Sequence, residues 1–142
     1  MIKDAASNHA ILQGYIDCFL QTNQRKVLQQ WADAEWTPDK DLEYDEVCLK
    51  YIALVILDAI ANKAHKILLE MGCPVLVAAP GDSYMLPGAP ESMLARGLEI
   101  IREICGISGG RAAGTLVLGI GSNSMELGIE KNAGLHVIIL TP

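Results

Sequence analysis

The sequence predicts an α/β (α+β) fold, in which helices cover a five-stranded antiparallel sheet in the order α-β-β-α-β-β-β after an additional N-terminal helical segment. Up to residue 71, apolar residues mostly recur at spacings of three and four, which is typical of helices. Beyond it, short apolar or alternating runs lie between turn residues, which is typical of strands. Hydrophobic residues make up 51% of the chain and charged residues 20%, so a disordered protein is excluded.

The N-terminal segment, residues 1–42, is predicted to be a helical extension of a core at residues 43–142, and the two form a single domain. Residues 8–34 carry an apolar stripe, which Thr22-Asn23 divides into two helices because such residues break or recap a helix. The connector at residues 33–46 is acidic, and carboxylates can bind Ca²⁺ or Mg²⁺. Their spacing does not match a calcium-binding loop, so we expect no metal.

The longest helical pattern runs from residue 44 to about Met71, with Gly72 where a helix C-cap belongs. Its middle is apolar almost all round. We therefore expect this helix to be buried between two layers.

Two strands and a helix are predicted next. Residues 74–79 and 83–86 form strands around a turn at residues 80–82, and a helix runs from Glu91 to Cys105. The apolar arc of this helix is wider than one sheet face requires, so we predict that it also contacts a second copy of the chain. The predicted contact residues are Met93, Arg96, Gly97, Ile100, Ile101 and Ile104.

Three strands close the chain, at residues 116–120, 125–130 and 137–140. The middle strand alternates, with Leu127 and Ile129 facing one way and Glu126 the other, as in a half-buried strand. The outer two are continuously apolar, as strands covered on both faces would be.

No catalytic or cofactor motif is evident. The glycine-rich residues 106–114 follow a helix and precede a strand, the reverse of a phosphate-binding loop, so we expect a simple connection. The four cysteines have no metal or redox spacing and are expected to be buried free thiols in a reducing compartment. A possible ligand loop is formed by Gly81, Asp82, Tyr84 and Arg111. We predict no cofactor and no metal, although an enzyme with dispersed catalytic residues stays open.

The net charge of −6 argues against nucleic acid as a partner, because phosphate neutralisation needs clustered basic residues. No apolar run is long enough to cross a membrane, and the first residues carry no apolar signal segment. We therefore expect a cytoplasmic protein without membrane contacts.

The run GCPVLVAAPGDSYMLPGAPESMLARGLEII and the tail VLGIGSNSMELGIEKNAGLHVIIL carry a resemblance to a known family. Over residues 72–142 the order of strand, turn, strand, helix and three closing strands resembles the roadblock/longin-like (profilin-like) domains. The resemblance implies a non-enzymatic homodimer that pairs through the helix after the second strand. It also implies a scaffold or regulatory protein, with a small GTPase as a possible partner.

Two other families share part of the pattern. The segment from Met71 to Ala79 is similar to a haem-binding profilin-like family, which implies a small-molecule or haem site that uses the sheet and residues 81–88. The stretch GIGSNSMELGIEKNAG is similar to the hut-operon antiterminator, an RNA-binding regulator. The acidic charge speaks against the second alternative.

Overall fold

The computed structural model describes residues 5–36, 44–70, 73–105, 113–121, 123–132 and 135–141. These ranges contain four helices and one six-stranded antiparallel sheet. The α+β class is therefore confirmed, but the prediction of five strands is wrong. None of the four helices has the length and apolar character that crossing a bilayer requires.

The N-terminal segment forms two helices, α1 (Ala5–Phe19) and α2 (Gln24–Asp33). The chain breaks where the sequence indicated, because the side chain of Asn23 accepts a hydrogen bond from the backbone N–H of Lys26 at 3.1 Å and caps α2. Leu12, Ile16 and Leu28 are fully buried in the same core as the rest of the chain. The two helices therefore form part of the core.

The long helix α3 (Tyr44–Ala61) ends about ten residues before the predicted end. Lys63 takes the left-handed conformation (φ 58°), and the N–H groups of Lys63 and Ala64 donate to the carbonyls of Ile60 and Ala59 at 3.0 and 2.9 Å. This is a Schellman motif with lysine where glycine is usual. Because this position is not glycine, no helix stop was visible in the sequence here, and Gly72 lies outside the described residues.

The residues after this stop form the strand that was not predicted, β1 (Lys66–Glu70). It continues into the hairpin β2 (Val75–Ala79) and β3 (Asp82–Leu86), and then into helix α4 (Glu91–Ile104). The closing strands are β4 (Ala113–Ile120), β5 (Asn123–Asn132) and β6 (Leu135–Thr141). The two three-stranded units meet at β1 and β6, which gives the strand order β3-β2-β1-β6-β5-β4.

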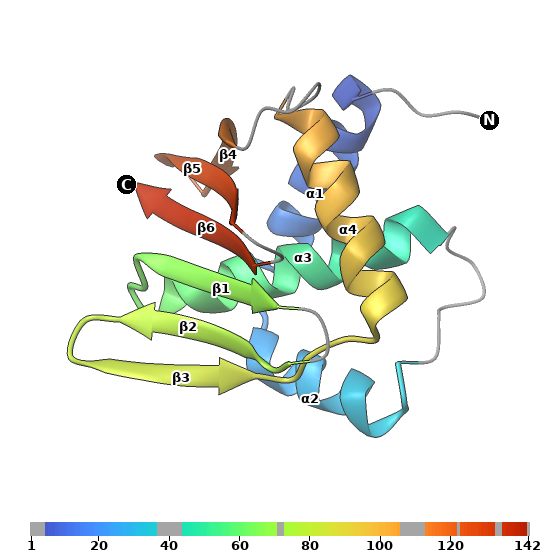
Figure 1. Cartoon of the computed structure of the whole chain (residues 1–142), viewed down its shortest axis with the longest axis vertical. Coiled ribbons are helices and arrows are strands. Elements are labelled where there is room, and N and C mark those ends of the chain that lie inside the picture. The colour runs from blue at the N-terminus through green and yellow to red at the C-terminus, as the bar shows by residue number, and fades with distance from the viewer. Residues whose placement is uncertain are drawn as a thin grey trace.

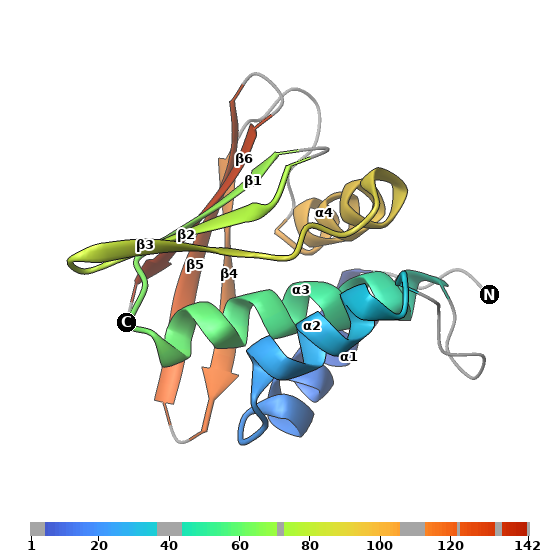
Figure 2. The ribbon, with the colours of Figure 1, turned by 90° about the horizontal axis from the view of Figure 1, so that it is seen from below.

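The helices lie on one side of the twisted sheet, as Figures 1 and 2 show. Side chains alternate as a one-sided sheet requires, with Ile67 and Leu69 of β1, and Leu127 and Ile129 of β5, buried toward the helices. Helix α3 packs against α1, α2 and α4. Most of its residues from Val47 to Ala59 are buried, which confirms that it lies between two layers.

The left-handed conformation of Lys63 at the end of α3 can be tested by substitution. Lys63→Gly should raise the free energy of unfolding by about 0.5–1 kcal/mol, because glycine adopts the left-handed conformation without a Cβ penalty. Urea denaturation measures the change. Lys63→Ala is the matched control, since it removes the lysine side chain and keeps the strain, and it should not stabilise the protein. Equal stability of the two variants would contradict the assigned backbone conformation.

Candidate functional site

The helix predicted to contact a second copy is α4, and its apolar arc is already covered within the chain. Met93, Gly97, Ile100 and Ile101 are all buried, and only Ile104 remains half-buried. The second surface that the wide arc requires is provided by α3 and α1 of the same molecule. The width of the arc therefore does not by itself indicate a partner subunit, and pairing through this helix stays a prediction.

Gly97 shows how closely the two helices approach. A Cβ atom at this position would lie 3.1 Å from Cγ1 of Ile52 and 3.4 Å from the carbonyl oxygen of Cys48, both on α3. Arg96 holds the same contact by a bidentate pair, with its Nε and NH2 groups 2.8 and 2.9 Å from the two carboxylate oxygens of Asp45. This pairing raises the pKa of Arg96. Both residues therefore join α4 to α3.

The predicted ligand loop does not converge on one site. Gly81 lies in the exposed β2–β3 turn with φ 79°. Tyr84 instead points into the body, where its hydroxyl donates to the carboxylate of buried Asp58 at 2.8 Å and its ring lies 4.4 Å below the guanidinium of Arg25. Burial raises the pKa of Tyr84, and the hydrogen bond to Asp58 raises it further. The side chain of Asp82 and all of Arg111 lie outside the described residues.

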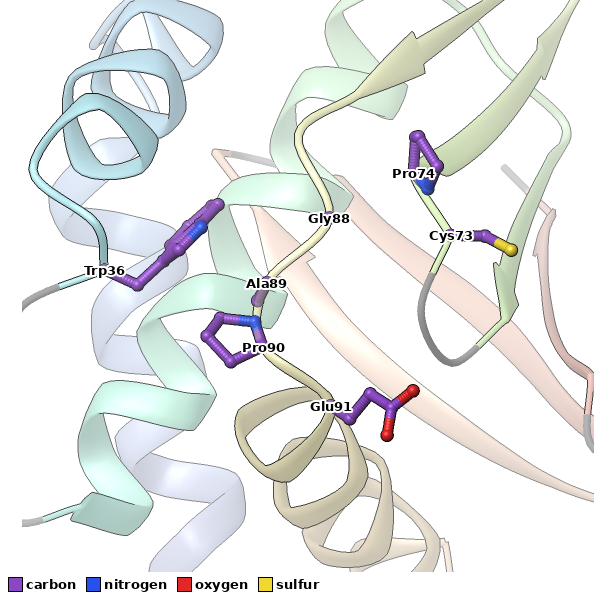
Figure 3. Close-up of a pocket in the computed structure, with 7 residues that line it drawn as sticks. All are labelled: Trp36, Cys73, Pro74, Gly88, Ala89, Pro90 and Glu91. Atoms are coloured by element: carbon purple, nitrogen blue, oxygen red, sulfur yellow. The ribbon is translucent and has the colours of Figure 1, made fainter.

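A pocket of about 480 Å³ lies at the opposite end of β3 from that turn (Figure 3). Its floor is the connection from β3 to α4, at Gly88, Ala89 and Pro90, and it ends at Glu91. Figure 3 shows the indole of Trp36 on one side of this floor and Cys73, Pro74 and the Glu91 side chain on the other. The pocket therefore gathers residues from the end of α2, the β1–β2 turn and the start of α4.

Two close contacts shape this pocket. A Cβ atom on Gly88 would lie 2.6 Å from the carbonyl oxygen of Cys73, so only glycine allows the β1–β2 turn to approach the floor. The hydroxyl of Tyr51 donates to the carbonyl oxygen of Pro87 at 3.0 Å and accepts from the N–H of Ala89 at 3.4 Å. Burial raises the pKa of Tyr51 to about 12. Tyr51 of α3 therefore holds the floor of the pocket in place by these two hydrogen bonds.

Trp36 is held by an aromatic cluster. Its ring centroid lies 5.4 Å from that of Trp31 and 5.4 Å from that of Tyr51, the second in an edge-on arrangement. Such pairs favour one orientation of the rings. The sequence carried no signal that Trp36 would meet Cys73 and Gly88, because these residues are distant in the chain.

No metal or redox centre is formed in the part of the chain that the structure describes, where no three His, Cys, Asp or Glu side chains come together. Burial raises the pKa of the Cys48 and Cys105 thiols to about 11. Cys18 and Cys73 are exposed. All four are free thiols, but the expected burial is wrong for Cys18 and Cys73.

Besides the pocket, a candidate binding surface is the side of the sheet that faces away from the helices, which we call the outer face. Leu68, Leu76, Met85 and Val137 point outward from β1, β2, β3 and β6, and the strand register places them in one row. Met85 is 66% exposed and Leu76 36%, whereas Val137 is already buried, at 7%. Val117 of β4 is also outward and is 54% exposed.

The free edge of β4 is partly closed by α1. The side-chain amide of Gln13 donates to the carbonyl oxygen of Gly119 and accepts from its N–H, both at 2.8 Å, as a neighbouring strand would. Nε2 of His9 donates to the carbonyl oxygen of Val117 at 2.9 Å. Such side-chain cover reduces pairing of exposed edges with other chains. The outer face of the sheet is therefore more open to a partner than the free edge of β4.

Comparison with known proteins gives no family. No family model matches the chain, and no curated protein matches it. Among solved structures, the chain is similar to the pilus retraction motor PilT with bound ADP, with 15% identity and a TM-score of 0.38. The match covers 62% of this chain and 27% of the PilT chain. A likeness at this level carries no argument about fold or function.

The close approach at Gly88 predicts a cost for any side chain there. Gly88→Ala should lower the free energy of unfolding by about 1–3 kcal/mol, because the added methyl group meets backbone that must shift. Gly14→Ala is the control. It lies within α1 with no atom near the added Cβ, so it should raise stability by about 0.5–1 kcal/mol. Urea titration of both variants would contradict the close approach if Gly88→Ala were as stable as the parent.

The cysteine environments predict selective alkylation. A thiol pKa of about 11 leaves roughly 100-fold less thiolate near neutral pH than the ordinary value of 9.0. Iodoacetamide should therefore modify Cys18 and Cys73 first, and Cys48 and Cys105 only slowly. Peptide mass spectrometry over time measures the four rates. Modification of Cys48 in the native protein as fast as Cys73 would contradict the assigned burial.

Proposed function

We propose that the protein is a non-enzymatic homodimeric scaffold or regulatory protein, and that two copies associate through the outer face of the sheet. The observation that supports the proposal is the apolar row Leu68, Leu76, Met85 and Val137 across four adjacent strands. An antiparallel sheet with one face in water usually carries polar residues on that face. Here Leu68, Leu76 and Met85 take outward positions of β1 to β3, beside the polar residues Lys66, Glu70 and Ser83.

The strand sequences support the same proposal. Residues 75–79 (VLVAA) and 137–140 (VIIL) have no polar alternation, a pattern typical of strands buried on both faces. In the described part of the chain, the helices cover only one of these faces. A second copy would cover the other. It would remove Leu76 and Met85 from water, which is the main driving force for association.

The charges on the outer face favour an arrangement in which the β1–β3 halves meet. Glu126 and Glu130 point outward from β5, with Glu130 beside Val137, whereas Lys66 and Glu70 point outward on either side of Leu68 in β1. A two-fold axis near Leu68 and Leu76 would bring apolar surface onto apolar surface. It would leave the acidic β5 positions of the two copies apart, so their repulsion would remain small.

A dimer of this kind leaves the helical side of each copy accessible to a further protein. The roadblock resemblance suggests a small GTPase as that partner. In our proposal, α4 serves the fold of each copy, and the outer face serves association.

The outer face makes a mutational prediction. Leu76→Glu should convert a dimer into a monomer at micromolar concentration, because it places a charge in the centre of the apolar row. Analytical ultracentrifugation measures the mass. The fold should survive, since Leu76 is 36% exposed, and circular dichroism checks this.

The matched control is Tyr44→Glu. Tyr44 is also a large exposed apolar side chain (47%), but it lies at the start of α3, away from the sheet. This variant should remain dimeric. A parent protein that is monomeric at micromolar concentration would contradict the proposal, as would a dimeric Leu76→Glu variant.

A further inference from the structure

We propose that the pocket between Trp36 and Glu91 binds a small organic cation that carries an apolar end, such as an aromatic or aliphatic amine. This site is independent of self-association. The pocket volume of about 480 Å³ lies within the range of small-molecule sites, about 300–1,000 Å³. It faces solvent beside the β3–α4 connection (Figure 3).

The apolar end of the ligand would meet rings. Trp36 forms one wall, and the rings of Pro74 and Pro90 and the methyl group of Ala89 complete an apolar lining. The face of an indole attracts aromatic rings and cations. Because Trp36 already packs against Trp31 and Tyr51, its orientation is fixed before a ligand arrives. Less ordering is then required on binding.

The charge of the lining favours a cation. Prolines have no N–H, so Pro74 and Pro90 contribute only carbonyl oxygens as hydrogen-bonding groups. The N–H of Ala89 is directed at the hydroxyl of Tyr51. Among the described residues that line the pocket, Glu91 is the charged one, and no basic side chain accompanies it. An ammonium group supplies the positive charge that this lining lacks.

The start of α4 disfavours a cation, because the N-terminus of a helix carries a partial positive charge of roughly half an elementary charge. Glu91 is the first residue of α4, and its carboxylate carries a full negative charge. The local balance is therefore negative. The net charge of −6 on the chain acts in the same sense.

Three probes that differ only in their polar end test the charge preference. They are 2-phenylethylammonium, 2-phenylethanol and phenylacetate, which share one ring and differ in charge. Isothermal titration calorimetry should show that the ammonium binds about 10-fold more tightly than the alcohol, with the carboxylate weakest. Preferential binding of phenylacetate, equal binding of all three, or no binding of the ammonium would each overturn the proposal.

Cys73 reports where the probe binds. It lines the pocket and is exposed, so bound ammonium should slow its alkylation by iodoacetamide. Cys18 is the internal control, because it is also exposed but lies on α1, outside this pocket. Equal slowing of both thiols, or of neither at a saturating probe concentration, would overturn the assignment of this pocket.

Two variants test the contributions of Glu91 and Trp36 to binding. Glu91→Gln should weaken the ammonium about 3-fold to 10-fold and leave the alcohol unchanged, because only the charge contact is lost. Trp36→Leu should weaken both probes, but it also disturbs the aromatic cluster, so the first variant decides the outcome. Glu103→Gln, on the exposed side of the same helix, is the matched control and should have no effect. Full ammonium affinity in Glu91→Gln would overturn the proposed role of the carboxylate.

Discussion

The burial of helix α3 is the constraint on which the other elements depend. One side of this helix faces the sheet, and its other sides are covered by α1, α2 and α4. This enclosure places Asp58 in the interior with only 4% of its surface exposed. A buried carboxylate needs partners, and Tyr84 from β3 and Arg25 from α2 provide them at 2.8 and 3.4 Å. The same cluster therefore joins the central helix to the sheet and to the N-terminal segment.

The enclosure of α3 also determines which surfaces remain for function. Because α4 covers α3, its wide apolar arc is used inside the molecule, and Gly97 allows the two helices to approach closely. The β4 edge is occupied in part by Gln13 and His9 from α1. The apolar surface left outside the described helical layers is on the outer face of the sheet. The pocket beside Trp36 arises at the point where the start of α4 passes the β1–β2 turn.

Much of the fold could be predicted from the sequence, because apolar spacing reports local structure. The break at Asn23, the hairpin before α4 and the alternation of Leu127 and Ile129 were all visible in this way. Strand β1 was missed because Lys63 ends α3 in a conformation that normally indicates glycine. The width of the α4 arc showed that a second surface exists, but not that α3 of the same chain provides it. The pocket was missed because its residues meet only after folding.

Our central claim is that the outer face of the sheet joins two copies of this chain. Its most direct test is an isotope-filtered nuclear Overhauser experiment on a mixture of labelled and unlabelled protein. We expect contacts between copies at the methyl groups of Leu68, Leu76 and Met85. Contacts between copies that arise only from α1, α2 or α4 would contradict the claim, as would a sample without any contact between copies.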